Sequence, residues 1–148
     1  MILLDTGALE YFVSNQVDSD GEYSTTFDVR AEFEVKDGRR LPRQVRDLWE
    51  VDGFDRGLFL RCYKDMLNAH GGSSFYNMTG FGDVSILAVI KMTQVEEGAK
   101  LLPNDITVVT TDGPLAKRVR KEAKIPMSSG LVLSVNVVRP VDYWGAVE

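Results

Sequence analysis

Cysteine and histidine are almost absent from this chain of 148 residues, which has one of each, Cys62 and His70. A lone cysteine excludes a disulfide within the chain. No apolar run approaches the ~20 residues that a membrane-spanning helix needs. No signal peptide is recognisable either, because Asp5 interrupts the first apolar stretch. These absences predict a cytoplasmic protein with no membrane partner.

An excess of positive charge is also missing, since 17 basic residues face 22 acidic ones and the net charge is -5. This balance argues against a protein that coats nucleic acid by bulk charge. It still allows a local basic patch, because a site built from carboxylates lowers the net charge by itself. With 44% hydrophobic and 26% charged residues, the composition is that of a globular chain. The length suits a single domain over residues 1–148.

Apolar periodicity predicts strands that alternate with helices. Strands are expected at residues 1–4, 106–110 and 131–138, and helices after Asp5, over 55–69 and 83–96, and after Pro114. The strand at 106–110 is apolar without alternation, which is typical of a parallel strand covered on both faces. The pattern predicts an α/β fold, a three-layer α/β/α sandwich with a central, mostly parallel sheet.

Four further segments carry weaker signals. Residues 23–35 alternate like a strand, yet Thr26 is a possible helix N-cap, so strand and helix both remain open there. Pro42 suits the first position of a short helix that carries Val45, Leu48 and Trp49. Residues 72–82 are expected to form a loop, and residues 140–148 a tail.

Acidic residues stand at the ends of the predicted elements. Asp5 ends the first strand, Asp83 opens an apolar helix, and Asp112 follows the strand at 106–110. Each has an ordinary structural explanation as a helix cap, a dipole partner or a turn residue. Their coincidence at equivalent positions favours a ligand site at the carboxyl ends of parallel strands. Clustered carboxylates need a cation, and oxygen ligands select Mg²⁺ or Mn²⁺.

These motifs resemble those of PIN (PilT N-terminus) domain nucleases, in the compact form used by virulence-associated protein C toxins. The matching segments are residues 2–9, 29–33, 83–88 and 108–112 with Leu115. They occur in family order and span residues 1 to about 125. The resemblance implies a PIN-like fold and a metal-dependent endoribonuclease that hydrolyses RNA phosphodiester bonds. It also implies, more specifically, the toxin of a toxin–antitoxin pair.

The same resemblance assigns roles to individual residues. The catalytic, metal-binding acids are expected to be Asp5, Glu32, Asp83 and Asp112, with Thr6 and Thr110 in support. This choice takes residues 23–35 as a helix, and Asp28 and Glu34 are the reserves for Glu32. The expected cofactor is Mg²⁺ or Mn²⁺. The expected partners are RNA, an antitoxin protein and a second copy of the chain in a homodimer.

Other assignments compete with the nuclease. In one alternative the chain is a PIN-like binding or assembly module and the acids are structural. In another the chemistry is the same and the substrate is DNA, because no residue is identified that reads a 2′-hydroxyl and RNA rests on the resemblance alone. Residues 3–8 also match the active-site loop of retroviral-type aspartic proteases, although the helical content argues against that fold.

Basic and aromatic residues are candidates for RNA binding, although a solvated helix face and ordinary packing are the favoured explanations. The basic candidates are Lys117, Arg118, Arg120, Lys121 and Lys124, with Arg39, Arg40, Arg43 and Arg46 as a second group. Phe75 and Tyr76 are candidates for stacking on bases. His70 is expected to be a partner of a helix C-terminus, and Cys62 a core residue.

Overall fold

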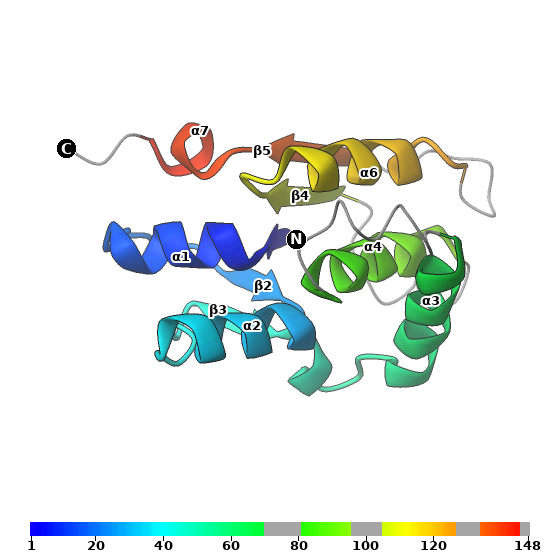
Figure 1. Ribbon diagram of the computed structural model, residues 1–148, viewed down its shortest axis with the longest axis horizontal. Coiled ribbons are helices and arrows are strands. Elements are labelled where there is room, and N and C mark those ends of the chain that lie inside the picture. Colours follow the sequence, from blue (N-terminus) through cyan, green and yellow to red (C-terminus); the bar gives the residue numbers. More distant parts are fainter. Residues whose placement is uncertain (70–80, 96–104, 127–133, 146–148) are drawn as a thin grey trace.

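A computed structural model describes residues 1–69, 81–95, 105–126 and 134–145. Five strands form one sheet in the order β3-β2-β1-β4-β5, and every neighbouring pair runs parallel. The strands are β1 (Ile2–Leu4), β2 (Tyr23–Thr25), β3 (Val45–Asp47), β4 (Asp105–Val109) and β5 (Ser134–Val138). The predicted α/β class with a parallel central sheet is therefore confirmed (Figure 1).

Helices connect the strands and cover the sheet. They are α1 (Thr6–Ser14), α2 (Phe27–Asp37), the 3-10 helix η1 (Leu48–Glu50), α3 (Arg56–Ala69), α4 (Phe81–Gln94), α6 (Gly113–Ala123) and α7 (Pro140–Trp144). Right-handed crossovers place α1 and α2 on one face of the sheet and α4 and α6 on the other. The helix α1 packs beside α2, and α4 packs beside α3, α6 and also α2 (Figure 1). Within the described ranges, no helix is long and apolar enough to span a membrane.

The core is centred on β1, β4 and α4. Leu3 and Leu4 of β1 are fully buried, and so are Ile106 and Val108 of β4. Along α4, every residue from position 82 to position 90 is buried, as expected for a helix that is apolar all round. Cys62 of α3 is also buried, which confirms its prediction as a core residue.

The order of the strands creates a switch point between β1 and β4. The chain leaves β1 toward one face of the sheet through α1, and leaves β4 toward the other face through α6. In open parallel sheets, the crevice at such a point lies at the carboxyl ends of the strands. Asp5 and Thr110 directly follow these two strands.

Residues 23–35 contain both of the structures that the sequence left open. The strand β2 covers only three residues, and α2 follows it directly. Thr26 caps α2, because its side-chain oxygen accepts a hydrogen bond from the Val29 amide at 3.3 Å. The prediction that Glu32 lies on a helix is therefore confirmed.

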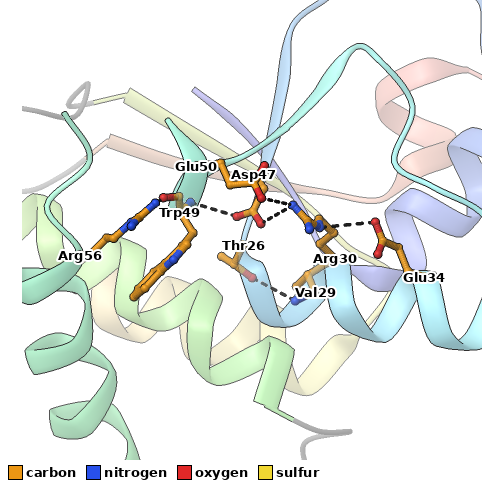
Figure 2. A network of polar contacts seen from close by, with 8 residues as sticks. All are labelled: Thr26, Val29, Arg30, Glu34, Asp47, Trp49, Glu50 and Arg56. Carbon is orange, nitrogen blue, oxygen red and sulfur yellow. Dashed lines mark hydrogen bonds and ion pairs between the residues drawn. The ribbon is translucent and has the colours of Figure 1, made fainter. Parts of the chain in front are cut away.

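The short helix predicted after Pro42 is wrong over Val45–Asp47, which form β3, whereas Leu48 and Trp49 lie in the 3-10 helix η1. Val45 and Asp47 are buried while Arg46 between them is exposed, which is the two-residue period of a strand. Figure 2 shows what holds this edge strand: Arg30 of α2 donates a hydrogen bond to Asp47 at 3.1 Å. Only three residues pair with β2, too few for periodicity to reveal the strand.

The C-terminal segment, predicted to be a tail, forms the short helix α7. Its Trp144 packs against the rings of Tyr11, Phe12 and Tyr23, and its indole donates a hydrogen bond to the Tyr23 hydroxyl at 3.1 Å. This aromatic contact orders the segment against α1. The loop predicted over residues 72–82 lies mostly outside the described residues, although Phe81 and the residue after it already belong to α4.

Candidate metal centre

The four predicted acids line one cleft at the carboxyl edge of the sheet. Asp5, Glu32, Asp83 and Asp112 all border this cleft, which has a volume of about 660 Å³. Helices in this fold run antiparallel to the strands that precede them, so helix N-termini gather at this edge. Asp5 and Asp112 are the N-caps of α1 and α6, and Asp83 lies in the first turn of α4.

Asp5 is the most buried acid of the cleft and is 5% exposed. One of its carboxylate oxygens accepts a hydrogen bond from the Ala8 amide at 2.8 Å, and the other accepts one from the Thr110 hydroxyl. Burial raises the pKa of Asp5 to about 6; the hydrogen bonds oppose this rise, and the nearby Asp112 charge adds to it. Asp5 is thus a carboxylate for which negative charge is unfavourable without a neighbouring cation.

Thr110 connects the two acids at the switch point. Its hydroxyl donates to Asp5 and accepts a hydrogen bond from the Asp112 amide at 2.9 Å. Asp112 in turn accepts a hydrogen bond from the Leu115 amide at 2.9 Å, which fixes it as the cap of α6. The predicted supporting role of Thr110 thus has a geometric basis, since one hydroxyl positions residues from the ends of both β1 and β4.

Glu32 extends from α2 across the cleft to α1 and α4. Its carboxylate accepts a hydrogen bond from the Thr6 hydroxyl at 2.8 Å and a longer one from the Gly82 amide at 3.4 Å. A Cβ atom on Gly82 would lie 2.9 Å from a carboxylate oxygen of Glu32. Glycine at position 82 therefore leaves room for the Glu32 carboxylate. Gly82 and Thr6 are the two residues that position this carboxylate.

The two reserve acids lie elsewhere. Asp28 borders a different, aromatic pocket, where it accepts a hydrogen bond from the Tyr63 hydroxyl. Glu34 pairs with Arg30 at 3.4 Å on another side of α2. The choice of Glu32 as the second acid of the cleft therefore agrees with the geometry, and neither reserve takes its place.

Asp83 reaches the cleft from α4 and is 7% exposed. The N-terminus of α4 is held against that of α2 by hydroxyl groups. Ser85 donates a hydrogen bond to the Gly82 carbonyl at 2.6 Å, and its hydroxyl lies 2.5 Å from that of Thr26. These contacts join the two helices that deliver Glu32 and Asp83.

Sequence reasoning missed two charged residues of the cleft. Glu10 and Lys36 both line it, and they form an ion pair at 3.1 Å that joins α1 to α2. The i, i+4 spacing of Thr6 and Glu10 along α1 is a signal that could have identified Glu10. Lys36 depends on how two helices pack, which periodicity does not reveal.

The donor atoms of the cleft fit a hard divalent cation. They are carboxylate and hydroxyl oxygens, the ligands that Mg²⁺ and Mn²⁺ prefer. In the part of the chain that the structure describes, no three His, Cys, Asp or Glu side chains are already grouped as a metal cage. Instead, the carboxylates of Asp5 and Glu32 are held by protein hydrogen bonds. Carboxylate oxygens keep further lone pairs after accepting one hydrogen bond, so these bonds orient the acids and leave acceptor capacity.

The RNA-binding residues predicted on α6 are not among the residues that line this cleft. Lys117, Arg120 and Lys121 are exposed on α6 and do not line it. Arg118 of the same helix is half-buried. The predicted residues His70, Phe75 and Tyr76 lie outside the described part of the chain.

The second basic group lies beside β3. Arg39 pairs with Asp37 at 2.6 Å. Arg40, Arg43 and Arg46 border an open groove of about 820 Å³. This groove is separate from the acidic cleft, because the residues that line the two do not overlap.

Comparison with protein-family models, curated proteins and solved structures found no match to this chain.

Proposed function

We propose that this protein is a metal-dependent endoribonuclease. One observation carries the proposal: Asp5, Glu32, Asp83 and Asp112 come from four elements and line a single cleft. The cleft lies at the switch point of a parallel sheet, where ligands bind in open α/β folds. RNA as the substrate rests on the resemblance of the sequence to PIN domain nucleases.

The proposal gives two roles to residues of the cleft, metal binding and orientation of the metal ligands. Asp5, Glu32, Asp83 and Asp112 hold Mg²⁺ or Mn²⁺, while Thr110 and Thr6 orient the carboxylates. A bound ion supplies a polarised water and stabilises charge on the scissile phosphate. A cleft lined by acids repels a phosphodiester unless its charge is neutralised, so RNA binding and metal binding are coupled.

Cleavage of mixed single-stranded and structured RNA in Mn²⁺ tests the proposal. Asp83→Asn keeps the shape of the side chain and removes its charge, so we expect cleavage to fall by at least about a hundredfold. Asp65→Asn, an exposed acid on α3, is the matched control and is expected to cleave normally. Cleavage that survives both Asp83→Asn and a chelator would rule out the metal nuclease.

Metal binding can be measured apart from cleavage. An ion that binds only the folded state raises the melting temperature in proportion to the logarithm of its concentration. We expect Mn²⁺ to stabilise the parent chain and Asp65→Asn equally, and Asp83→Asn much less. A parent chain that Mn²⁺ does not stabilise would favour the alternative of a PIN-like binding module.

One observation favours a protein partner at the same cleft. Val35 on its rim is 86% exposed, and Ala31 one turn earlier is exposed as well. A protein that covers these apolar side chains would close the cleft, which is the behaviour expected of an antitoxin or of a second copy of the chain. Val35→Ser, which removes the apolar surface without adding a charge to the cleft, tests this: it is expected to weaken such an association, measured by light scattering, without lowering Mn²⁺ binding.

A further inference from the structure

A second, aromatic pocket opens next to the acidic cleft. It has a volume of about 350 Å³ and is lined by Phe27, Asp28, Trp49, Phe59, Leu60 and Tyr63. Phe27 is 48% exposed and Leu60 is 53% exposed, so the edge of the pocket is apolar and open. Single exposed apolar residues are common, but a concave group of aromatic rings is typical of a binding site.

The rings of the pocket are held in place before any ligand arrives. Trp49 contacts Phe27 and Phe59, with ring centroids 6.3 and 6.0 Å apart. Figure 2 shows Arg56 beside the Trp49 indole; its guanidinium lies 5.0 Å from the ring centroid, and its Nε donates to the Trp49 carbonyl at 2.9 Å. The Trp49 amide donates to Asp47 at 3.0 Å. A fixed aromatic surface binds a flat ligand with little loss of side-chain entropy.

A carboxylate stands among these rings. Asp28 is half-buried and accepts a hydrogen bond from the Tyr63 hydroxyl. Burial raises the pKa of both Asp28 and Tyr63 above their ordinary values. A carboxylate has about four acceptor positions, of which Tyr63 occupies one. The pocket therefore offers an aromatic surface together with hydrogen-bond acceptors that match N–H donors of a ligand.

The pocket lies one helical turn from the acidic cleft. Asp28 and Glu32 are both on α2, four positions apart, which corresponds to about 6 Å along the helix axis. The two carboxylates are close enough for the charge of Glu32 to raise the pKa of Asp28. A single-stranded chain with one phosphate in the cleft thus has a neighbouring base within reach of the pocket.

We propose that this pocket is a subsite for an unpaired nucleobase that carries an exocyclic amino group. The base would stack on Phe27 and Trp49, and its amino group would donate to Asp28. Aromatic stacking combined with hydrogen bonds to the base edge is the usual way in which proteins read single-stranded RNA. An apolar protein side chain would leave the Asp28 acceptors unmatched, and uracil offers Asp28 a single ring N–H without an exocyclic amino group. The assignment to RNA rests on the function proposed above.

Titration of the ¹⁵N-labelled chain with neutral nucleosides tests the subsite without metal or cleavage. The chain has two tryptophans, so the indole signal of Trp49 reports the pocket, and that of Trp144, on the distant α7, is an internal control. Trp144→Phe assigns the two signals. We expect cytidine to shift the Trp49 signal at millimolar concentration, and uridine to need about fivefold more.

Two variants separate stacking from hydrogen bonding. Phe27→Ala removes a half-exposed ring and is expected to weaken cytidine binding about tenfold. Asp28→Asn keeps the shape and is expected to bring cytidine and uridine to similar affinity, because an amide both donates and accepts. Rescue of the preference by Asp28→Glu would support the assignment further.

Several results would overturn the subsite. They are a Trp49 signal that no nucleoside moves, equal responses to cytidine and uridine in the parent chain, or a signal that moves with protein concentration alone. The last result would assign the pocket to contact between copies of the chain. If RNA is cleaved but any of these results is found, the nuclease proposal is supported and the subsite proposal is wrong. If nucleosides bind as expected but RNA is not cleaved, the subsite proposal is supported and the nuclease proposal is not.

Discussion

The Thr110 hydroxyl donates its hydrogen bond to Asp5 across two neighbouring parallel strands. Leu4 of β1 is in register with Val109 of β4, so the residues that follow the two strands meet at the switch point. The same hydroxyl accepts from the Asp112 amide. The separation of the two acids is therefore set by backbone register and a single side chain.

Replacing Thr110 by valine keeps the shape and removes the hydroxyl. We expect the free energy of unfolding to fall by about 2 kcal/mol, because Asp5 loses a donor and the Asp112 amide loses an acceptor. Mn²⁺ stabilisation is expected to fall as well, since both acids lose their orientation. Thr93→Val is the matched control, because Thr93 is fully buried and donates only within α4. Equal Mn²⁺ responses in the two variants would show that Thr110 does not position the acids.

Asp5→Asn is expected to change the pH dependence of stability. The pKa of Asp5 is about 6 in the folded chain and near 4 when unfolded. Its favourable contribution is therefore present below about pH 4 and is lost as the pH rises through 6. At pH 7, without metal, we expect the variant to be more stable than the parent by roughly 2–3 kcal/mol, with a difference that disappears near pH 4.

Urea unfolding at a series of pH values measures this difference. Asp55→Asn, the same substitution at an aspartate that accepts a hydrogen bond from the Leu58 amide at the start of α3 and lies outside the cleft, shows what a change of cap does alone. A variant less stable than the parent by a constant amount at every pH would mean that capping outweighs the burial of charge at Asp5.

Gly82→Ala is expected to damage the cleft more than the fold. The new Cβ would lie 2.9 Å from the Glu32 carboxylate and 3.2 Å from a methyl group of Val29. Glu32 has a flexible side chain, so it can swing away, and we expect stability to change by no more than about 1 kcal/mol. Mn²⁺ affinity is expected to fall about tenfold, as thermal titration would measure.

Gly113→Ala provides the comparison for that variant. It also adds a methyl group at the start of a helix beside the cleft, but nothing lies within 4 Å of the new atom. Its stability is expected to stay the same or rise slightly, because alanine restricts the unfolded chain. Equal losses of Mn²⁺ binding in both variants would mean that crowding of Glu32 is not the cause.

Arg30→Met is expected to loosen the edge strand. The Arg30 guanidinium contacts Asp47 at 3.1 Å and Glu50 at 2.9 Å, and the Asp47 side chain is only 1% exposed (Figure 2). Removing the cation leaves Asp47 buried without its partner, so we expect a loss of about 2 kcal/mol, moderated by the partial exposure of Arg30. The double variant with Asp47→Asn is expected to recover part of this loss; additive losses would show that the pair is not coupled.

The acids at the ends of β1 and β4 and at the start of α4 were predictable from sequence, because a parallel sheet brings such positions together. Glu32 was harder, since a three-residue strand and a helix share one stretch and their periods overlap. The strand β3 was not predicted because a hydrogen bond from Arg30 of α2 helps to hold it in place. The local sequence pattern does not indicate such a contact between two elements. Lys36 and the aromatic pocket likewise arise from packing between elements.

The pairing of β1 with β4 has a consequence for when the cleft exists. Asp5 and Thr110 lie 105 residues apart in the chain, so a ribosome makes Asp5 long before its partner. Contacts of such sequence separation form late and slow the folding of a domain. A nascent chain that stops before β4 has no complete cleft, even if its first helices have already folded. If the cleft cleaves RNA, the nascent protein therefore cannot cleave the message being translated until β4 and Asp112 have been made and have folded against β1.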